Sequence, residues 1–238
     1  MNVYWTLCPS VTTSKTILSE IHYNEPENVF KNVIKNKNTK NEPQDYVYCP
    51  SFRDLLSNTY SIKFPFDYEL TYGEGSIKSK RYDQKFFDEY VYLRSVPDKV
   101  ISLNIRYLFF SEKSLEILLS SPYFSNNEFT KYNKVIPGKF DIGKWLRPIE
   151  IALSTSPEID NIIMKRGDDA AYITFLTNEK INLKKFYLTD KIRHYVDHNT
   201  IARRYNNSGS NLQYLYDRFI MSKQKNFILK EIKDNLME

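Results

Sequence analysis

The clearest residues that could do chemistry are the charged segment Arg166-Gly167-Asp168-Asp169, which separates two apolar, strand-like runs. A guanidinium and two carboxylates could hold a polar ligand, so Arg166, Asp168 and Asp169 are candidate ligand-binding residues. Gly167 supplies the positive φ that a tight turn needs, and a hairpin tip leaves its flanking charges in water. The favoured interpretation is therefore a hairpin turn.

A second cluster lies at residues 141–148. Trp145 offers a stacking face, and Lys144 and Arg147 offer contacts to an anion. Asp141, just before them, could accept a proton. These four residues complete the candidate ligand-binding set, although core packing of Trp145 beside a surface Arg147 is the favoured alternative.

Metal and nucleophile chemistry find little support in the residue spacing. His194 and His198 lie four apart on a predicted helix, but no glutamate follows His194, and His22 lies far away in the sequence. Cys8 and Cys49 each precede a proline and have no metal-type spacing, so reduced, buried thiols are expected. No Gly-x-Ser-x-Gly elbow is present. We therefore predict no catalytic residue, no metal and no cofactor.

The composition favours a mainly β (α+β) protein. The 238 residues include 19 Tyr and 15 Phe but only 6 Gly, and aromatic side chains prefer pleated, half-buried surfaces. The net charge of +5 comes from residues 184–238, which hold eleven Lys or Arg against six Asp or Glu. Nucleic-acid binding is one alternative for this basic segment, through Lys184, Lys185, Arg203 and Arg204.

The pattern along the chain predicts a β-rich body over residues 1–188 and a helical appendage over 189–238, packed on the body. Residues 2–7 form a strand, and residues about 10–45 form a mobile polar segment with one helical turn near 29–34. A second helical turn is expected at 51–56. Alternating apolar residues predict a half-buried strand pair across Pro65, with one parity shared by Ile62, Phe64, Phe66, Tyr68 and Leu70.

Two further strands, at 99–110 and 114–119, are separated by a short loop that suits a hairpin. In the appendage, Ile192 and Val196 predict one helix over 189–204. A longer helix is predicted from Asn211, with buried positions at Leu212, Leu215, Phe219, Phe227, Ile228 and Ile232.

Three stretches, read together, resemble the conserved motifs of the trimeric dUTP pyrophosphatase and dCTP deaminase superfamily. They are FPFDYELTY (64–72), LEILLSSPYFSNN (115–127), and KVIPGKFDIGKWLRPIEIAL (134–153) followed by IIMKRGDDAAYITF (162–175). Gly167, Asp168 and Ala171 match the fourth motif best. The resemblance spans roughly residues 60–176, and it implies a β-clip or jelly-roll-like body of short strands assembled as a trimer.

The departures from the family pattern decide the expected activity. The aspartate that activates water in that family is replaced here by Pro137 or Gly138, neither of which can take a proton. The phosphate-binding Arg-Ser pair of the second motif is replaced at residues 121–123 by Ser-Pro-Tyr. Asp141 could act as a shifted carboxylate, with Arg147 restoring the phosphate contact.

The order of these motifs is also similar to that in proteins of tailed phages of marine bacteria, and the Asn and Lys excess fits an AT-rich viral genome. We therefore hypothesise a non-catalytic phage binding or assembly protein on a degenerate dUTPase-like scaffold. Its partner would be further copies of itself or a host or phage protein. A nucleotide-binding or nucleotide-processing enzyme and a nucleic-acid-binding protein are the alternatives. No apolar run approaches the length that crosses a bilayer, so we expect no membrane partner and a location in the host-cell cytoplasm.

Overall fold

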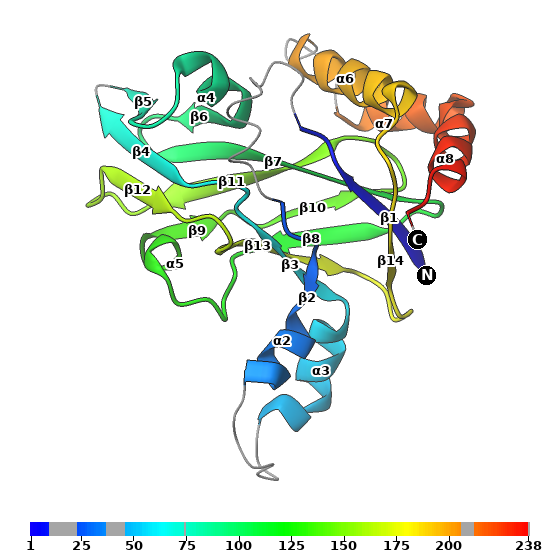
Figure 1. Ribbon diagram of the computed structural model, residues 1–238, viewed down its shortest axis with the longest axis horizontal. Coiled ribbons are helices and arrows are strands. Elements are labelled where there is room, and N and C mark those ends of the chain that lie inside the picture. The colour runs from blue at the N-terminus through cyan, green and yellow to red at the C-terminus, as the bar shows by residue number, and fades with distance from the viewer. Residues whose placement is uncertain (10–22, 37–45, 74, 206–211, 238) are drawn as a thin grey trace.

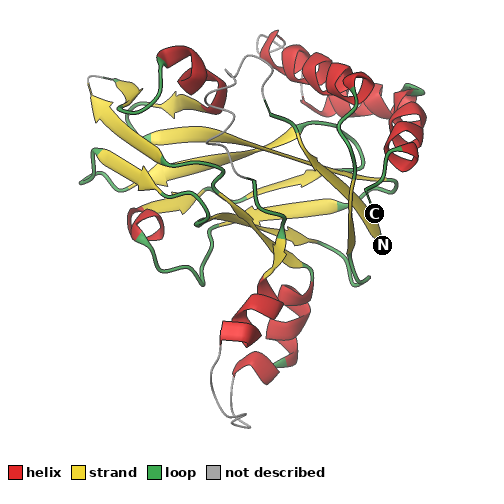
Figure 2. Cartoon of the chain, in the orientation of Figure 1, coloured by secondary structure: helices red, strands yellow, loops and turns green. Residues whose placement is uncertain are grey.

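The computed structural model describes residues 1–9, 23–36, 46–73, 75–205 and 212–237 (Figure 1). More of these residues lie in strands than in helices, so the protein is mainly β. The strands form a six-stranded sheet A, a five-stranded sheet B and a three-stranded sheet C, with the helices at their periphery (Figure 2). None of the helices in these ranges is long and apolar enough to cross a membrane.

Sheet A is built around one long strand, β7 (Val100–Ser111), most of whose side chains are buried on both faces. One edge of β7 pairs with β1 (Asn2–Leu7) and with β6 (Val91–Ser95), and the other edge pairs with β11 (Pro148–Thr155). The sheet is completed by β14 (Asn182–Lys185) beyond β1 and by β9 (Asn133–Val135) beyond β11.

Sheet B has the order β10-β8-β13-β3-β2, and sheet C has the order β12-β4-β5. The strands of sheet B are β10 (Gly138–Asp141), β8 (Glu116–Ser120), β13 (Asp169–Phe175), β3 (Thr59–Lys63) and β2 (Glu27–Asn28). The strands of sheet C are β12 (Asn161–Met164), β4 (Tyr68–Gly73) and β5 (Ser76–Ser79). A single core cluster joins side chains from all three sheets, including Leu103, Ile173 and Leu70.

Gly167 lies in a tight turn with a φ of +86°, as predicted, but the predicted hairpin is wrong because β12 and β13 belong to different sheets. β13 pairs with β3 in sheet B, whereas β12 pairs with β4 in sheet C. The two pairs form one antiparallel ribbon that bends where β3 leads into β4 and β12 leads into β13. At the bend, Gly167 N donates to the Phe64 carbonyl (3.0 Å) and Phe64 N donates to the Asp168 carbonyl (3.0 Å). The charged segment is therefore the corner of a bent ribbon.

The bend explains why the predicted alternation holds across Pro65. The side chains at 62, 64, 66, 68 and 70 are all buried, as predicted, because they enter the core that the sheets share. The second predicted hairpin, between the strands at 99–110 and 114–119, is wrong for a similar reason. β7 lies in sheet A and β8 in sheet B, so the loop between them crosses from one sheet to the other.

Helices cover the periphery of the strands. The hairpin of α2 (Val29–Asn36) and α3 (Pro50–Ser57) extends from β2 and β3 at the bottom of Figure 1. Shorter helices are η1 (Tyr46–Tyr48), α4 (Gln84–Tyr90) and α5 (Glu128–Tyr132). The predicted mobile segment 10–45 thus contains β2 and α2, and the rest of it, at 10–22 and 37–45, lies outside the described residues.

The C-terminal helices α6 (Asp190–Tyr205), α7 (Leu212–Met221) and α8 (Gln224–Asp234) pack against the face of sheet A opposite the shared core (Figure 1). Their contact is apolar: Ile192 and Ile232 cluster with Tyr4 and Phe110, which point away from the main core. The single helix predicted from Asn211 is interrupted after Met221. Phe227, predicted to be buried, is 63% exposed.

Both cysteines are free thiols. Cys8 is buried as predicted, and burial raises the pKa of its thiol. Cys49 is exposed, which corrects the prediction of two buried thiols. It precedes the first residue of α3, Pro50, at a helix end that faces water.

Candidate functional site

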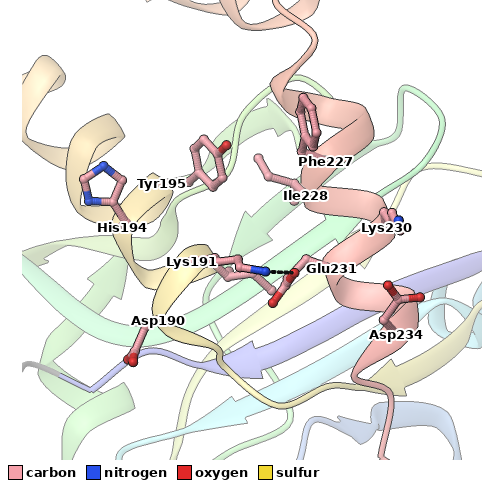
Figure 3. Close-up of a pocket in the computed structure, with 10 residues that line it drawn as sticks. Asp190, Lys191, His194, Tyr195, Phe227, Ile228, Lys230, Glu231 and Asp234 are labelled. Carbon is pink, nitrogen blue, oxygen red and sulfur yellow. Dashed lines mark hydrogen bonds and ion pairs between the residues drawn. The ribbon is translucent and has the colours of Figure 1, made fainter.

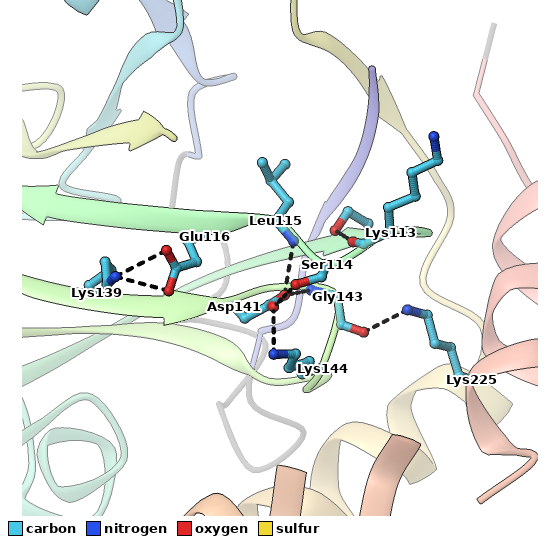
Figure 4. Close-up of polar contacts among 10 residues, drawn as sticks. Lys113, Ser114, Leu115, Glu116, Lys139, Asp141, Gly143, Lys144 and Lys225 are labelled. Atoms are coloured by element: carbon cyan, nitrogen blue, oxygen red, sulfur yellow. Dashed lines mark hydrogen bonds and ion pairs between the residues drawn. The ribbon is translucent and has the colours of Figure 1, made fainter. Parts of the chain in front are cut away.

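Asp141, the predicted shifted carboxylate, is buried at the end of β10 (Figure 4). Its Oδ1 accepts hydrogen bonds from the backbone N–H groups of Leu115 (3.0 Å) and Gly143 (2.8 Å). Its Oδ2 accepts the hydroxyl of Ser114 and lies 3.4 Å from Nζ of Lys144. These donors outweigh burial and hold the pKa of Asp141 below its ordinary value. The carboxylate therefore fastens the loop between β7 and β8 to sheet B.

The neighbours of Asp141 are also engaged within the chain. Trp145 is buried, and its ring packs edge-to-face with the ring of Tyr216 of α7, with 5.4 Å between the centroids. The guanidinium of half-buried Arg147 lies over the ring of Phe140 at 5.4 Å. Lys225 of α8 donates to the Gly143 carbonyl (2.8 Å), so the loop also anchors the appendage (Figure 4). The structure thus brings Asp141 and Lys144 together and places Trp145 in packing, as the favoured alternative for Trp145 predicted.

The charged residues at the corner, 166–169, lie in two different environments. Arg166 is exposed, and its backbone N–H donates to Oδ1 of Asp67 (2.8 Å). Oδ2 of Asp67 pairs with Arg81 at 3.0 Å. Burial, together with the charge of Asp169, raises the pKa of Asp168. Of the residues at this corner, Asp169 lines the cavity described below.

Asp169 is the centre of a polar network between β3 and β13. It accepts the hydroxyls of Ser61 and Ser125, and its Oδ1 lies 2.9 Å from Nζ of Lys63. Lys63 also lies 3.5 Å from Glu27 of β2. Burial alone would lower the pKa of Lys63, but the hydrogen bond and charge of Asp169 raise it, so Lys63 stays cationic. A cationic lysine cannot serve as a general base, so the network is suited to binding.

This network forms the floor of a cavity of about 520 Å³ between α2 and sheet B, which we call the aromatic pocket. Its polar members are Glu27, Asn32, Lys35, Ser61, Lys63, Asp169 and Tyr172, and its apolar walls are formed by Val29, Val33, Tyr46 and Phe124. The volume is within the usual range of about 300–1,000 Å³ for ligand sites. Sequence reasoning identified Asp169 and missed the others, because the pairing of β3 with β13 brings together residues more than 100 positions apart.

A second hollow, the appendage groove, lies between α6 and α8 and has a volume of about 680 Å³ (Figure 3). Its apolar side chains are Ile192, Tyr195, Phe227 and Ile228. Its charged side chains have both signs: Asp190, Lys191, Lys230, Glu231 and Asp234, and His194 lines it as well. Lys191 and Glu231 approach each other across the groove at 3.3 Å. This groove was missed because helix periodicity predicts one buried face and carries no information on how two helices are spaced.

The predicted nucleic-acid-binding residues do not gather into one described patch. Lys184 and Lys185 are neighbours on β14, so their side chains leave opposite faces of the sheet. Lys185 pairs with Glu25 at 3.0 Å and lies over the ring of Trp5 at 5.1 Å. Arg203 and Arg204 belong to α6, but their side chains lie outside the described residues.

Within the described ranges, no group of three or more His, Cys, Asp or Glu side chains could hold a metal ion. His194 and His198 are both exposed on α6. Comparisons of this chain with protein-family models, with curated proteins and with solved structures found no match. Function is therefore inferred from the chain's own residues and their geometry.

Proposed function

We propose that this chain is a non-catalytic binding or assembly protein that associates with a second copy of itself through the appendage groove. The observation that carries the proposal is the position of Phe227. Its ring is 63% exposed, and it also lines an apolar groove of about 680 Å³. Exposed apolar surface bordered by charged groups is typical of protein-binding sites.

The surface is self-complementary, which favours a second copy as the occupant. In a contact with two-fold symmetry both copies present the same patch, so a projecting group and a hollow on one face satisfy each other twice. Phe227 of one copy enters the groove of the other beside Ile228, and its own groove receives the second ring. The charges around the groove have both signs, as self-pairing requires, with Asp190 and Asp234 available to meet Lys230.

The appendage exposes further apolar side chains on α7. Tyr214 and Ile220 of α7 are 58% and 47% exposed, and Met221 at the end of α7 is 86% exposed. Aromatic residues and methionine are enriched in protein interfaces. The family resemblance favours a trimer. A trimer would form most simply if Phe227 and the appendage groove lay on different faces of the protein. Because Phe227 borders its own groove, we propose a dimer.

The occupied oxygens of Asp141 support the absence of catalysis in this proposal. A water-activating carboxylate needs a lone pair free to accept a proton, and both oxygens of Asp141 already accept donors from this chain. We propose that a degenerate dUTPase-like scaffold of β-clip or jelly-roll type has lost its reaction in this way. The Asn and Lys excess supports a tailed-phage origin, and two free cysteines fit a reducing compartment such as the host cytoplasm.

Sedimentation equilibrium of the full chain, over about a hundredfold range of concentration, tests the assembly. We expect twice the chain mass at high concentration. Phe227→Asp should raise the dissociation constant by at least about thirtyfold, because a buried aromatic anchor contributes about 2 kcal/mol or more.

The matched control is Val96→Asp, which changes an apolar side chain that is 51% exposed on the β6–β7 turn. It should leave the dimer intact, and both variants should keep the wild-type circular dichroism. A chain that stays monomeric at every concentration contradicts the proposal. So does a Phe227→Asp variant that dimerises as tightly as the wild type, or a trimer.

A further inference from the structure

We propose that the aromatic pocket is a binding site for a neutral saccharide. The pocket lies at the α2 side of sheet B, at the opposite end of the molecule from α6 and α8 (Figure 1), so the inference is independent of the assembly surface. Its volume of about 520 Å³ accommodates a mono- or disaccharide by comparison with ligand sites in general.

The charges of the pocket exclude a charged ligand. Two carboxylates, Glu27 and Asp169, are balanced by two ammonium groups, Lys35 and Lys63. Lys63 lies between the carboxylates, 2.9 Å from Asp169 and 3.5 Å from Glu27. A phosphate placed against Lys63 would be repelled by both carboxylates, and an ammonium ion placed against a carboxylate would be repelled by Lys63.

Hydroxyl groups suit this floor because each can donate one hydrogen bond and accept others. The carboxylate of Glu27 accepts from a ligand hydroxyl, and the ammonium of Lys63 donates to one. Tyr172 also lines the cavity, and its hydroxyl stays neutral because burial and then the charge of Asp169 raise its pKa. A ligand with several adjacent hydroxyls therefore matches a floor in which hydrogen-bond donors and acceptors lie side by side, whereas a ligand with a single charge does not.

The wall of the pocket provides the apolar surface that the C–H face of a sugar ring needs. Phe124 and Tyr46 line the cavity and remain 38% and 49% exposed. Phe52 holds both rings in edge-to-face contacts, at 5.7 Å from Phe124 and 4.9 Å from Tyr46. Val33 of α2 lines the same cavity. The rings are thus fixed in place by their neighbours before a ligand arrives, which reduces the entropy lost on binding.

Saturation-transfer NMR of the full chain with glucose, galactose, mannose, N-acetylglucosamine and their common disaccharides tests the site. We expect at least one sugar to receive saturation through its ring C–H protons. Phe124→Ala should weaken that binding by about tenfold, the value of one good aromatic contact. Tyr187→Ala, which removes a 60% exposed ring at a residue hydrogen-bonded through its backbone to Asn235 after α8, should leave it unchanged.

Glu27→Gln tests the charge balance separately, because this exposed side chain can change without loss of the fold. The variant leaves the pocket with one excess positive charge, so its preference should shift from glucose towards glucose 6-phosphate. The proposal is overturned if no sugar in the panel binds or if Phe124→Ala binds as well as the wild type. It is also overturned if Glu27→Gln leaves the preference unchanged, or if only peptides or nucleotides compete for the pocket.

Discussion

Asp141 and Asp169 are carboxylates whose oxygens accept hydrogen bonds from donors of the same chain. Asp141 accepts from Ser114, Leu115 and Gly143, and Asp169 accepts from Ser61, Ser125 and Lys63. The first fastens a loop to sheet B. The second lies at a cavity, where Lys63 and Glu27 extend its polar surface. The surroundings of each side chain therefore decide its role.

Asp141→Asn should destabilise the protein by about 2 kcal/mol, because an amide nitrogen cannot accept the donors that now meet the carboxylate. The pKa of Asp141 is lowered in the folded state, so its contribution is complete above the unfolded pKa and is lost as pH falls through the folded pKa. The difference between variant and wild type should therefore be largest near neutral pH and should shrink in acid. Urea unfolding at several pH values measures it.

Asp160→Asn is the control for this change. Its side chain is 71% exposed and pairs with Lys99 at the surface, so the loss should stay below about 1 kcal/mol. Equal losses for the two variants, or a loss at Asp141 that does not depend on pH, would show that the carboxylate does not fasten the loop.

At the scale of the elements, the sequence predicted which side chains are buried better than which strands are neighbours. The alternation from Ile62 to Leu70 correctly placed five side chains in the core. It could not show that β3 and β4 lie in different sheets, because alternation identifies a face and not a pairing partner. Both predicted hairpins failed for this reason. The aromatic pocket was missed as well, since Lys63 meets Asp169 only through the β3–β13 pairing.

The crossing loop between β7 and β8 depends on a close approach at Gly143. A Cβ atom added there would overlap the carbonyl of Lys113, with the carbonyl carbon only 2.8 Å away. Gly143→Ala should therefore cost about 1–3 kcal/mol, since backbone must move to make space. Urea unfolding gives the value, and Gly138→Ala is the matched control because nothing lies within 4 Å of its added Cβ. Equal stability of the two alanine variants would contradict the close packing of this loop.

At the scale of the whole molecule, the two hollows lie on separate parts of the fold and differ in character. The appendage groove is largely apolar and is bordered by exposed side chains, whereas the aromatic pocket has a floor of balanced charges. The chain has a net charge of +5, but the lysines that line each hollow do not outnumber its carboxylates. Neither hollow therefore offers a partner an excess of positive charge.

Acid should unfold the molecule through a small set of aspartates. The pKa values of Asp67, Asp141 and Asp169 are lowered in the folded state, mainly by hydrogen bonds from backbone and side-chain donors that outweigh burial. Below about pH 4 the unfolded chain takes up protons at these positions before the folded chain does, so the free energy of unfolding falls as pH decreases. Asp168 opposes the trend, because burial raises its pKa and folding is favoured when it becomes protonated.

Among the described residues, three aspartates with lowered pKa values act against one with a raised pKa, so the free energy of unfolding should fall steadily from about pH 5 to pH 2 in urea titrations. Asp169→Asn removes one of the three groups and should make this fall shallower, while lowering stability at pH 7, because Lys63 then loses its nearest carboxylate. Asp160→Asn should follow the wild-type slope because its side chain is exposed to water. If Asp169→Asn also kept the wild-type slope, the Lys63–Asp169 pair could not be part of the acid-sensitive set. The ordered polar floor of the aromatic pocket would then lose its main support.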